Sequence, residues 1–181
     1  MFSDTDSINF HCKIANNNSN KAISLLNKLG IASTTYSHTP IFTEQEHQML
    51  QNILTGNSAK SILIRDKNYV LYLITVSSES ELFKPTLKTI ADKLKLSLED
   101  LRFVDESIFQ KKLQISSDSI SPLALINDVC HEIKFVIDEN LFDVNIINLY
   151  ALTNDLTISI TCQDLLNYCN YLNHEPMLVR F

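Results

Sequence analysis

The order of strand-like and helix-like segments is the feature that most restricts how this chain can fold. Residues 61–65 and 69–76 are rich in Ile, Leu, Val and Tyr, and the polar segment 66–68 between them predicts a tight hairpin. Further strands are expected at 31–36, 102–104, 133–137, 144–150, 156–160 and 177–179. Because strands follow one another directly as well as alternating with helices, a mixed, mostly antiparallel sheet is favoured over a doubly wound parallel one.

Helices are expected where apolar residues recur at helical spacing behind a capping residue. Thr43 and Glu46 form a capping-box pattern at the start of segment 43–54. Thr161 opens a last helix in the same way, and its apolar stripe includes Cys162 and Cys169. Other helical segments are expected at 21–29, at 85–94 with Pro85 in the first turn, and at 107–113 with Ser107 as its cap. The chain is therefore predicted to be an α/β protein of the α+β type.

The sequence shows no internal repeat and no linker, so its 181 residues predict one domain. Residues 1–20 are polar and end in an Asn-rich run, which predicts a flexible extension before a folded domain at 21–181. The N-terminus lacks the basic and apolar regions of a signal peptide, and no apolar run reaches the about 20 residues that span a bilayer. We therefore expect a cytoplasmic protein that has no membrane partner.

Several kinds of chemistry are excluded by composition and spacing. Only two glycines are present, so neither a dinucleotide-binding nor a P-loop glycine motif can be written. The four cysteines and five histidines have no metal-binding spacing, so we expect no metal and no cofactor. The net charge of −6 argues against a broad electrostatic grip on nucleic acid, and any contact with RNA is expected to be small.

Several short motifs become informative when they are taken together. They are Tyr36-Ser-His38, Phe42-Thr43, Lys60-Ser-Ile-Leu-Ile-Arg-Asp66, Ser121-Pro-Leu-Ala-Leu-Ile-Asn-Asp128, Leu152-Thr-Asn154, and Asp164-Leu-Leu166 through His174-Glu-Pro176. In this order and spacing, residues 20–181 resemble the YbaK/prolyl-tRNA-synthetase-associated domain family. Within that family the chain is most similar to the branch of freestanding Ala-tRNA(Pro) deacylases of the ProX/PrdX type.

The resemblance implies both a fold and a reaction. The fold is a mixed, partly curled sheet surrounded by helices. The reaction is metal-independent hydrolysis of the ester that joins a wrong amino acid to tRNA, most closely Ala-tRNA(Pro). The implied partners are the 3′ acceptor end of tRNA, most closely tRNA(Pro), and prolyl-tRNA synthetase. Because an aminoacyl ester is already activated, the protein must mainly position it and supply donors near the carbonyl oxygen.

The resemblance also assigns site residues. Lys60 matches the family lysine that can hold a terminal phosphate or the ester, although by itself it would be interpreted as an ordinary surface lysine. Asp118 and Ser119 match the start of a loop whose backbone amides face the substrate. Further substrate-binding residues are expected at His38, Phe42, Ile62, Ser121, Pro122, Leu123, Ala124, Tyr150 and Asn154. A pocket wall that admits a methyl group and excludes a pyrrolidine ring is expected from Ile62, Leu123, Leu125 and Ile126.

Two departures from the family pattern leave other functions open. Asp118 stands at the first glycine of the family loop, and Tyr150-Ala151 stands where relatives have His-Pro. Asp118 adds a negative charge near a phosphate site, and a tyrosine cannot serve as a base near neutral pH. A second hypothesis is therefore a catalytically impaired module that binds tRNA or the synthetase. A third, favoured by the acidic net charge, is a small interaction domain with no connection to tRNA.

Overall fold

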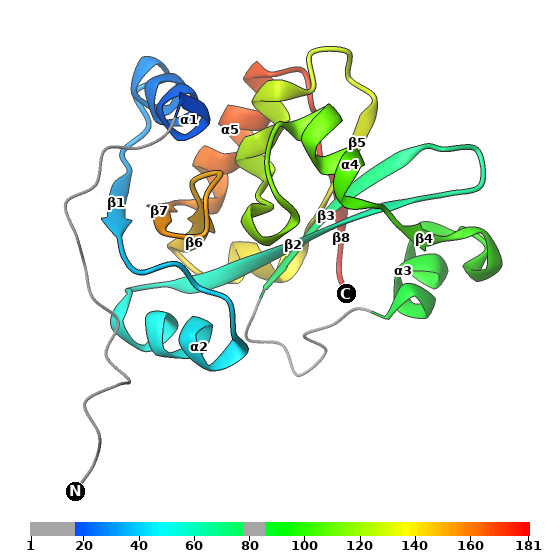
Figure 1. The fold of residues 1–181 in the computed structure, drawn as a ribbon, viewed down its shortest axis with the longest axis horizontal. Coiled ribbons are helices and arrows are strands. Elements are labelled where there is room, and N and C mark those ends of the chain that lie inside the picture. Colours follow the sequence, from blue (N-terminus) through cyan, green and yellow to red (C-terminus); the bar gives the residue numbers. More distant parts are fainter. Residues whose placement is uncertain (1–16, 78–85) are drawn as a thin grey trace, which may run out of the picture.

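The computed structural model describes residues 17–77 and 86–181, and Figure 1 shows their arrangement. The α-helices are α1 (Asn17–Lys28), α2 (Glu44–Ile53), α3 (Leu87–Leu94), α4 (Glu106–Ile108) and α5 (Cys162–Tyr171). The strands are β1 (Thr34–Ser37), β2 (Asn57–Arg65), β3 (Leu71–Ser77), β4 (Arg102–Phe103), β5 (Ile133–Asp138), β6 (Ile147–Tyr150), β7 (Leu156–Ile160) and β8 (Met177–Val179).

One open, eight-stranded sheet runs in the order β1-β7-β6-β2-β3-β5-β8, and β4 pairs with β2. The pairs β1–β7, β6–β7, β2–β3 and β2–β4 are antiparallel. The pairs β2–β6, β3–β5 and β5–β8 are parallel. The predicted mixed, mostly antiparallel α/β fold is thus confirmed.

Strand β2 joins the two halves of the sheet, and Figure 1 shows it running from α2 to the hairpin. Its first residues, Asn57 and Ser58, pair with β6, whereas Ala59 onward pairs with β3. Gly56 makes this transition possible, because it has φ +92° and a Cβ there would collide with the carbonyl oxygen of Ile146. Lys60 therefore lies just beyond the point where the sheet changes partners.

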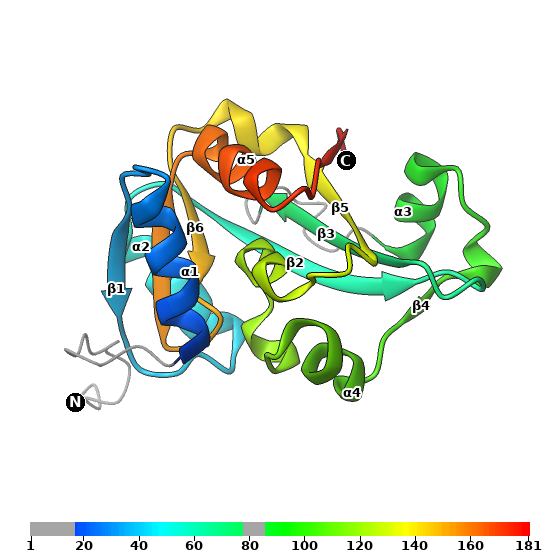
Figure 2. The ribbon, with the colours of Figure 1, turned by 90° about the horizontal axis from the view of Figure 1, so that it is seen from above.

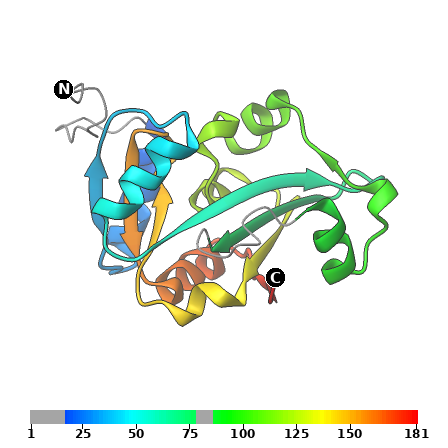
Figure 3. The ribbon, with the colours of Figure 1, turned by 90° about the horizontal axis from the view of Figure 1, so that it is seen from below.

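Both faces of the sheet are covered. Figures 2 and 3, seen from opposite sides, show α1 and α5 on one side and α2 on the other. Strand β3 is buried at every position, with Leu73 in the larger apolar cluster and Ile74 in a smaller cluster that includes Ile90 of α3. This explains its continuous apolar sequence, since a strand covered on both faces does not alternate.

Several local predictions are confirmed. Segment 66–68 closes the β2–β3 hairpin, and Thr43 forms the expected capping box with Glu46. Thr161 caps α5 by accepting a hydrogen bond from the backbone of Asp164. Cys162 and Cys169 are buried in the core. Within the described residues, no helix has the length and apolar character needed to cross a membrane.

Other local predictions were wrong. Residues 17–20, expected in the extension, form the first turn of α1, because Ser19 is buried and donates a hydrogen bond to the carbonyl of Ala151. The segment predicted to start at Ser107 begins at Glu106, after Asp105, and continues as a π-helical turn over Phe109–Leu113. Helix α3 is capped by Thr86. Pro85 and residues 1–16 lie outside the described residues.

Candidate functional site

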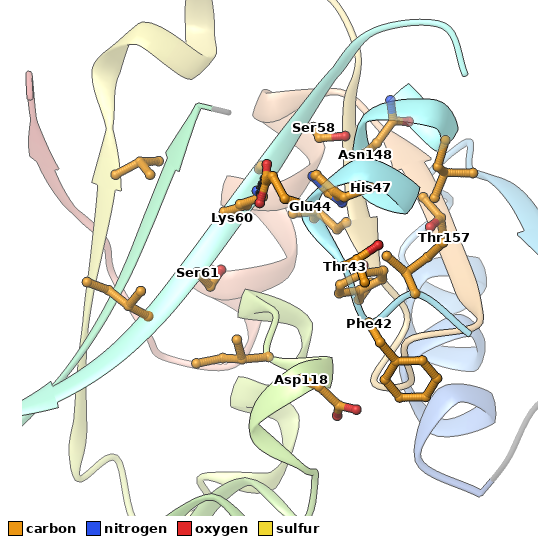
Figure 4. A pocket seen from close by; sticks show the side chains of 18 of the residues that line it. Phe42, Thr43, Glu44, His47, Ser58, Lys60, Ser61, Asp118, Asn148 and Thr157 are labelled. Carbon is orange, nitrogen blue, oxygen red and sulfur yellow. Dashed lines mark hydrogen bonds and ion pairs between the residues drawn. The ribbon is translucent and has the colours of Figure 1, made fainter. Parts of the chain in front are cut away.

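A cavity of about 520 Å³ lies between α2, the first half of β2 and a turn at 116–119 (Figure 4). Nine of its nineteen lining residues are apolar and ten carry a polar side chain, so the cavity can contact both apolar and polar parts of a ligand. The lining residues are Ile41, Phe42, Thr43, Glu44, His47, Leu50, Ser58, Ala59, Lys60, Ser61, Ile62, Val76, Phe103, Asp118, Ile120, Asn148, Leu149, Tyr150 and Thr157. Lys60 is the one cation among these lining residues.

The capping box sets the position of the α2 wall. The Glu46 carboxylate accepts hydrogen bonds from the backbone N–H groups of Phe42 and Thr43, both at 2.9 Å, and these bonds lower its pKa. The Thr43 hydroxyl accepts from the Glu46 N–H at 3.2 Å. Glu44 and His47 are three residues apart, so they lie on the same side of this fixed helix, which is the side that faces the cavity.

Lys60 and Glu44 form an ion pair at the cavity. The Lys60 Nζ lies 2.7 and 2.8 Å from the two carboxylate oxygens of Glu44. The Glu44 side chain is 67% exposed, so this pair is accessible to water and contributes at most about 1 kcal/mol. An incoming anion can therefore compete with Glu44 for the ammonium group.

His47 and Tyr150 are both uncharged near neutral pH. Burial, with a further contribution from the Lys60 charge, lowers the pKa of His47 to about 4. Its Nε2 is the one buried side-chain polar atom without a hydrogen-bond partner in the part of the chain that the structure describes. The two rings meet edge to face, with centroids 6.3 Å apart. Burial, together with the Asp118 and Glu44 carboxylates, raises the pKa of Tyr150 to about 12, so its hydroxyl can donate a hydrogen bond but cannot act as a base.

The opposite wall is built around Asp118. One carboxylate oxygen accepts hydrogen bonds from the hydroxyls of Ser116 and of Ser119, the latter at 2.9 Å. The other accepts from the side-chain amide of Asn154 at 3.0 Å, and the same amide nitrogen donates to the carbonyl of Ile41 at 3.3 Å. Asp118 is not among the described residues with positive φ, so an aspartate fits this backbone position without strain.

The structure brings five of the predicted site residues to the cavity: Phe42, Lys60, Ile62, Asp118 and Tyr150. Asn154 is not a lining residue, but its side-chain amide donates a hydrogen bond to the Asp118 carboxylate. His38 is buried outside the lining, where its ring nitrogens lie 2.8 Å from the Thr39 carbonyl and 2.9 Å from the hydroxyl of Thr157, and burial lowers its pKa. His38 therefore supports a lining residue and does not itself reach the cavity.

Of the wall expected from Ile62, Leu123, Leu125 and Ile126, Ile62 lines the cavity, whereas the prediction for the other three residues was wrong. Ser121 caps a 3₁₀ helix over Pro122–Asn127, which turns Leu123, Ala124 and Leu125 into the main core. The Leu123 carbonyl accepts a hydrogen bond from the Tyr168 hydroxyl at 2.9 Å. None of Ser119, Ser121, Pro122, Leu123 and Ala124 lines the cavity. The backbone N–H of Ser119 already donates to the Ser116 carbonyl at 3.1 Å, which leaves Asp118 as the loop's remaining predicted amide donor.

Sequence reasoning did not identify Glu44, His47 or Phe103 as lining residues. A signal existed for His47, because it precedes Leu50 and Leu54 by three and seven residues and so occupies the apolar stripe of α2. Glu44 and Phe103 carry no comparable signal, since they reach the cavity only through the packing of α2 and β4 against β2.

Comparison with known proteins identifies the family of this chain. Residues 38–168 match the model of the aminoacyl-tRNA editing domain. This match spans most of the chain, and the chain therefore belongs to the aminoacyl-tRNA editing domain family.

Individual relatives point the same way. The chain is 27% identical to prolyl-tRNA synthetase associated domain-containing protein 1 of Xenopus laevis, over 88% of this chain and 94% of that protein. It is also 27% identical to the prolyl-tRNA editing protein ProX of Acetoanaerobium sticklandii, over 79% and 85% of the two chains. The crystal structure of a candidate trans-editing enzyme for prolyl-tRNA synthetase superposes with a TM-score of 0.65 at 13% identity, over 93% of this chain and 99% of that one, which shows a shared fold.

Proposed function

We propose that this protein hydrolyses the ester of mischarged aminoacyl-tRNA, and that Ala-tRNA(Pro) is the substrate to which its pocket is directed. The observation that carries the proposal is Lys60, the one cation among the lining residues of the cavity, in a chain of the editing-domain family. The name of the bacterial relative, a prolyl-tRNA editing protein, supports the choice of tRNA. We further propose that the protein acts in the cytoplasm without metal or cofactor, and that prolyl-tRNA synthetase is a partner.

The chemistry requires little from the protein beyond positioning. Lys60 leaves Glu44 and donates to the terminal phosphate or to the ester carbonyl oxygen, where negative charge develops during attack by water. The backbone amide of Asp118 is the proposed second donor, and the vicinal ribose hydroxyl orients the water. Tyr150 contributes a hydrogen-bond donor, because its raised pKa keeps the hydroxyl protonated.

The first experiment is release of alanine from Ala-tRNA(Pro) by the purified protein, with Pro-tRNA(Pro) as the substrate that should be spared. Lys60→Ala should lower kcat/KM by about 100-fold, the typical effect of removing one donor from a developing oxyanion. Lys67→Ala is the matched control, because Lys67 pairs with Asp100 outside the cavity lining. Equal rates for wild-type protein and Lys60→Ala would exclude the proposed role of Lys60.

A second candidate is a module that binds the tRNA end without hydrolysing it. The observation that favours it is the charge of the lining, where Glu44 neutralises Lys60 and Asp118 adds another negative charge. Binding of tRNA without release of amino acid across a panel of mischarged tRNAs would support this candidate. Failure to bind tRNA at any salt concentration would instead favour an interaction domain with no connection to tRNA.

A further inference from the structure

Two aromatic residues, Phe42 and Phe103, line the cavity although most of each side chain is exposed to water. Phe42 is 75% exposed and Phe103 is 61% exposed, and both belong to the cavity lining. Figure 4 shows the Phe42 ring at the edge of the pocket, near Asp118. Leaving large apolar rings in water is unfavourable, so rings placed at a pocket often mark a binding surface.

Both rings are carried by fixed backbone. Phe42 directly precedes the cap of α2, and its N–H is bound to the Glu46 carboxylate at 2.9 Å. Phe103 lies on β4, in register with Ile64 of β2. Its neighbour Arg102 is held by hydrogen bonds to the carbonyls of Glu99 and Leu101 at 2.8 and 2.7 Å. The backbone that carries each ring is thus fixed, which lowers the entropic cost of stacking a flat ligand at these two positions.

The charge of the pocket argues against binding RNA through several phosphate contacts. Among the lining residues Lys60 is opposed by Glu44 and Asp118, and the whole chain carries a net charge of −6. Proteins that hold a nucleic acid through its phosphates need several unpaired cations and show a steep salt dependence. Stacking of bases on aromatic rings needs no such charge and contributes substantial affinity per base.

We propose that Phe42 and Phe103 stack on the unpaired nucleobases of an RNA 3′ end, and that stacking, not phosphate contact, supplies most of the affinity. This inference rests on the proposed function, which brings such an end to the pocket. Lys60 and Ile64 are four residues apart on β2, about 13 Å along the strand. That span leaves room for the ester at Lys60 and for bases toward Phe103, whose β4 position is opposite Ile64.

The test is binding of an uncharged RNA hairpin with a single-stranded 3′ end that carries 2-aminopurine as its terminal base. Stacking on Phe42 or Phe103 should quench the fluorescence of this base. Phe42→Ala and Phe103→Ala should each weaken binding about tenfold and restore the fluorescence. Phe42→Trp and Phe103→Trp should preserve both the affinity and the quenching, because tryptophan also stacks on bases. Tyr69→Ala is the matched control, because Tyr69 is equally exposed but lies on Arg65 outside the cavity lining.

The salt dependence supplies a second readout. A plot of log Kd against log salt concentration should have a slope no greater than that of about one phosphate contact, near 0.7 for a single strand. Wild-type affinity in both alanine variants, with thermal unfolding unchanged, would overturn the proposal, and so would a slope of several phosphates.

Because the hairpin carries no ester, this test is independent of hydrolysis. Stacking without deacylation would refute the proposed activity and keep the inference. Deacylation by the wild-type protein, together with unchanged RNA affinity in Phe42→Ala and Phe103→Ala, would support the proposed activity and refute the stacking inference.

Discussion

The two walls of the pocket each present one carboxylate, and the two carboxylates are held in different ways. On the α2 wall, Glu44 pairs with the ammonium group of Lys60 and is largely exposed. On the turn wall, Asp118 is held by three neutral donors, the hydroxyls of Ser116 and Ser119 and the amide of Asn154. The first arrangement can be exchanged for another anion at little cost, whereas the second fixes the shape of a turn.

The difference indicates that the two walls have different roles in the pocket. The α2 wall contains the groups that can respond to a ligand: the Lys60–Glu44 pair and the buried, unpartnered Nε2 of His47. The side chain of Asp118 on the turn wall serves to hold the turn, because its carboxylate accepts three internal hydrogen bonds, and the proposed contribution of this residue to the substrate is its backbone amide. Asn154 connects the walls, since one amide nitrogen donates both to Asp118 and to the Ile41 carbonyl, next to Phe42.

The largest expected effect is an acid sensitivity that arises at His47 on the α2 wall. The pKa of His47 is about 4 in the folded protein and 6.5 as a reference, so unfolding takes up a proton between these values. Stability that depends on a neutral His47 is therefore fully present above pH 6.5. It is lost as pH falls toward 4, because the unfolded chain takes up a proton that the folded protein does not. It amounts to up to about 3 kcal/mol of the free energy of unfolding.

His47→Leu should remove this part of the pH dependence. Urea unfolding of both proteins at pH 7.5 and at pH 4.5 provides the measurement, and the difference between the two proteins should change with pH. Glu44, Lys60 and His38 are the other titratable groups that act on His47, and they remain in the variant. Parallel stability curves for the two proteins would show that His47 is not the acid-sensitive group.

The turn wall should lose stability when its carboxylate is removed. Asp118→Ala deletes the acceptor of three hydrogen bonds in an exposed turn, and we expect a cost of about 1 kcal/mol. Asp118→Asn keeps one acceptor oxygen and should cost less. Thermal unfolding at pH 7.5 measures both variants. If Asp118→Ala were as stable as wild type, the hydrogen bonds would not be holding the turn.

Local chemistry explains which parts of this arrangement could be predicted. The capping box of α2, the Thr161 cap of α5 and the β2–β3 hairpin depend on residues a few positions apart, so the sequence was sufficient to predict them. The apolar run 122–126 was assigned to the pocket wrongly, because composition does not say which of two apolar environments a segment faces. The Lys60–Glu44 pair joins residues of different elements, and it forms only once α2 packs beside β2.

A smaller effect is expected from the exchangeable pair. Glu44→Gln removes the carboxylate that competes with a phosphate for Lys60, so affinity for the RNA hairpin should rise about threefold at low salt. The salt slope should increase by about 0.7, the value for one added phosphate contact on a single strand. Glu175→Gln, an exposed carboxylate outside the cavity lining, is the control of equal charge. Unchanged affinity and slope in Glu44→Gln would mean that Glu44 does not compete with the ligand.

The smallest effect tests whether the walls communicate through Asn154. Asp118 and Asn154 share a hydrogen bond of 3.0 Å, so the double variant Asp118→Ala/Asn154→Ala should be less destabilised than the sum of the single variants, by about 0.5 kcal/mol. Glu44→Gln combined with Asp118→Ala should be additive, because Glu44 pairs with Lys60 whereas Asp118 is held by the hydroxyls of Ser116 and Ser119 and by the amide of Asn154. The opposite result would be coupling between Glu44 and Asp118 and no coupling between Asp118 and Asn154. It would show that the walls do not communicate through Asn154. The carboxylates would then sense each other directly through the cavity, and Asn154 would serve only to hold the segment beside Phe42.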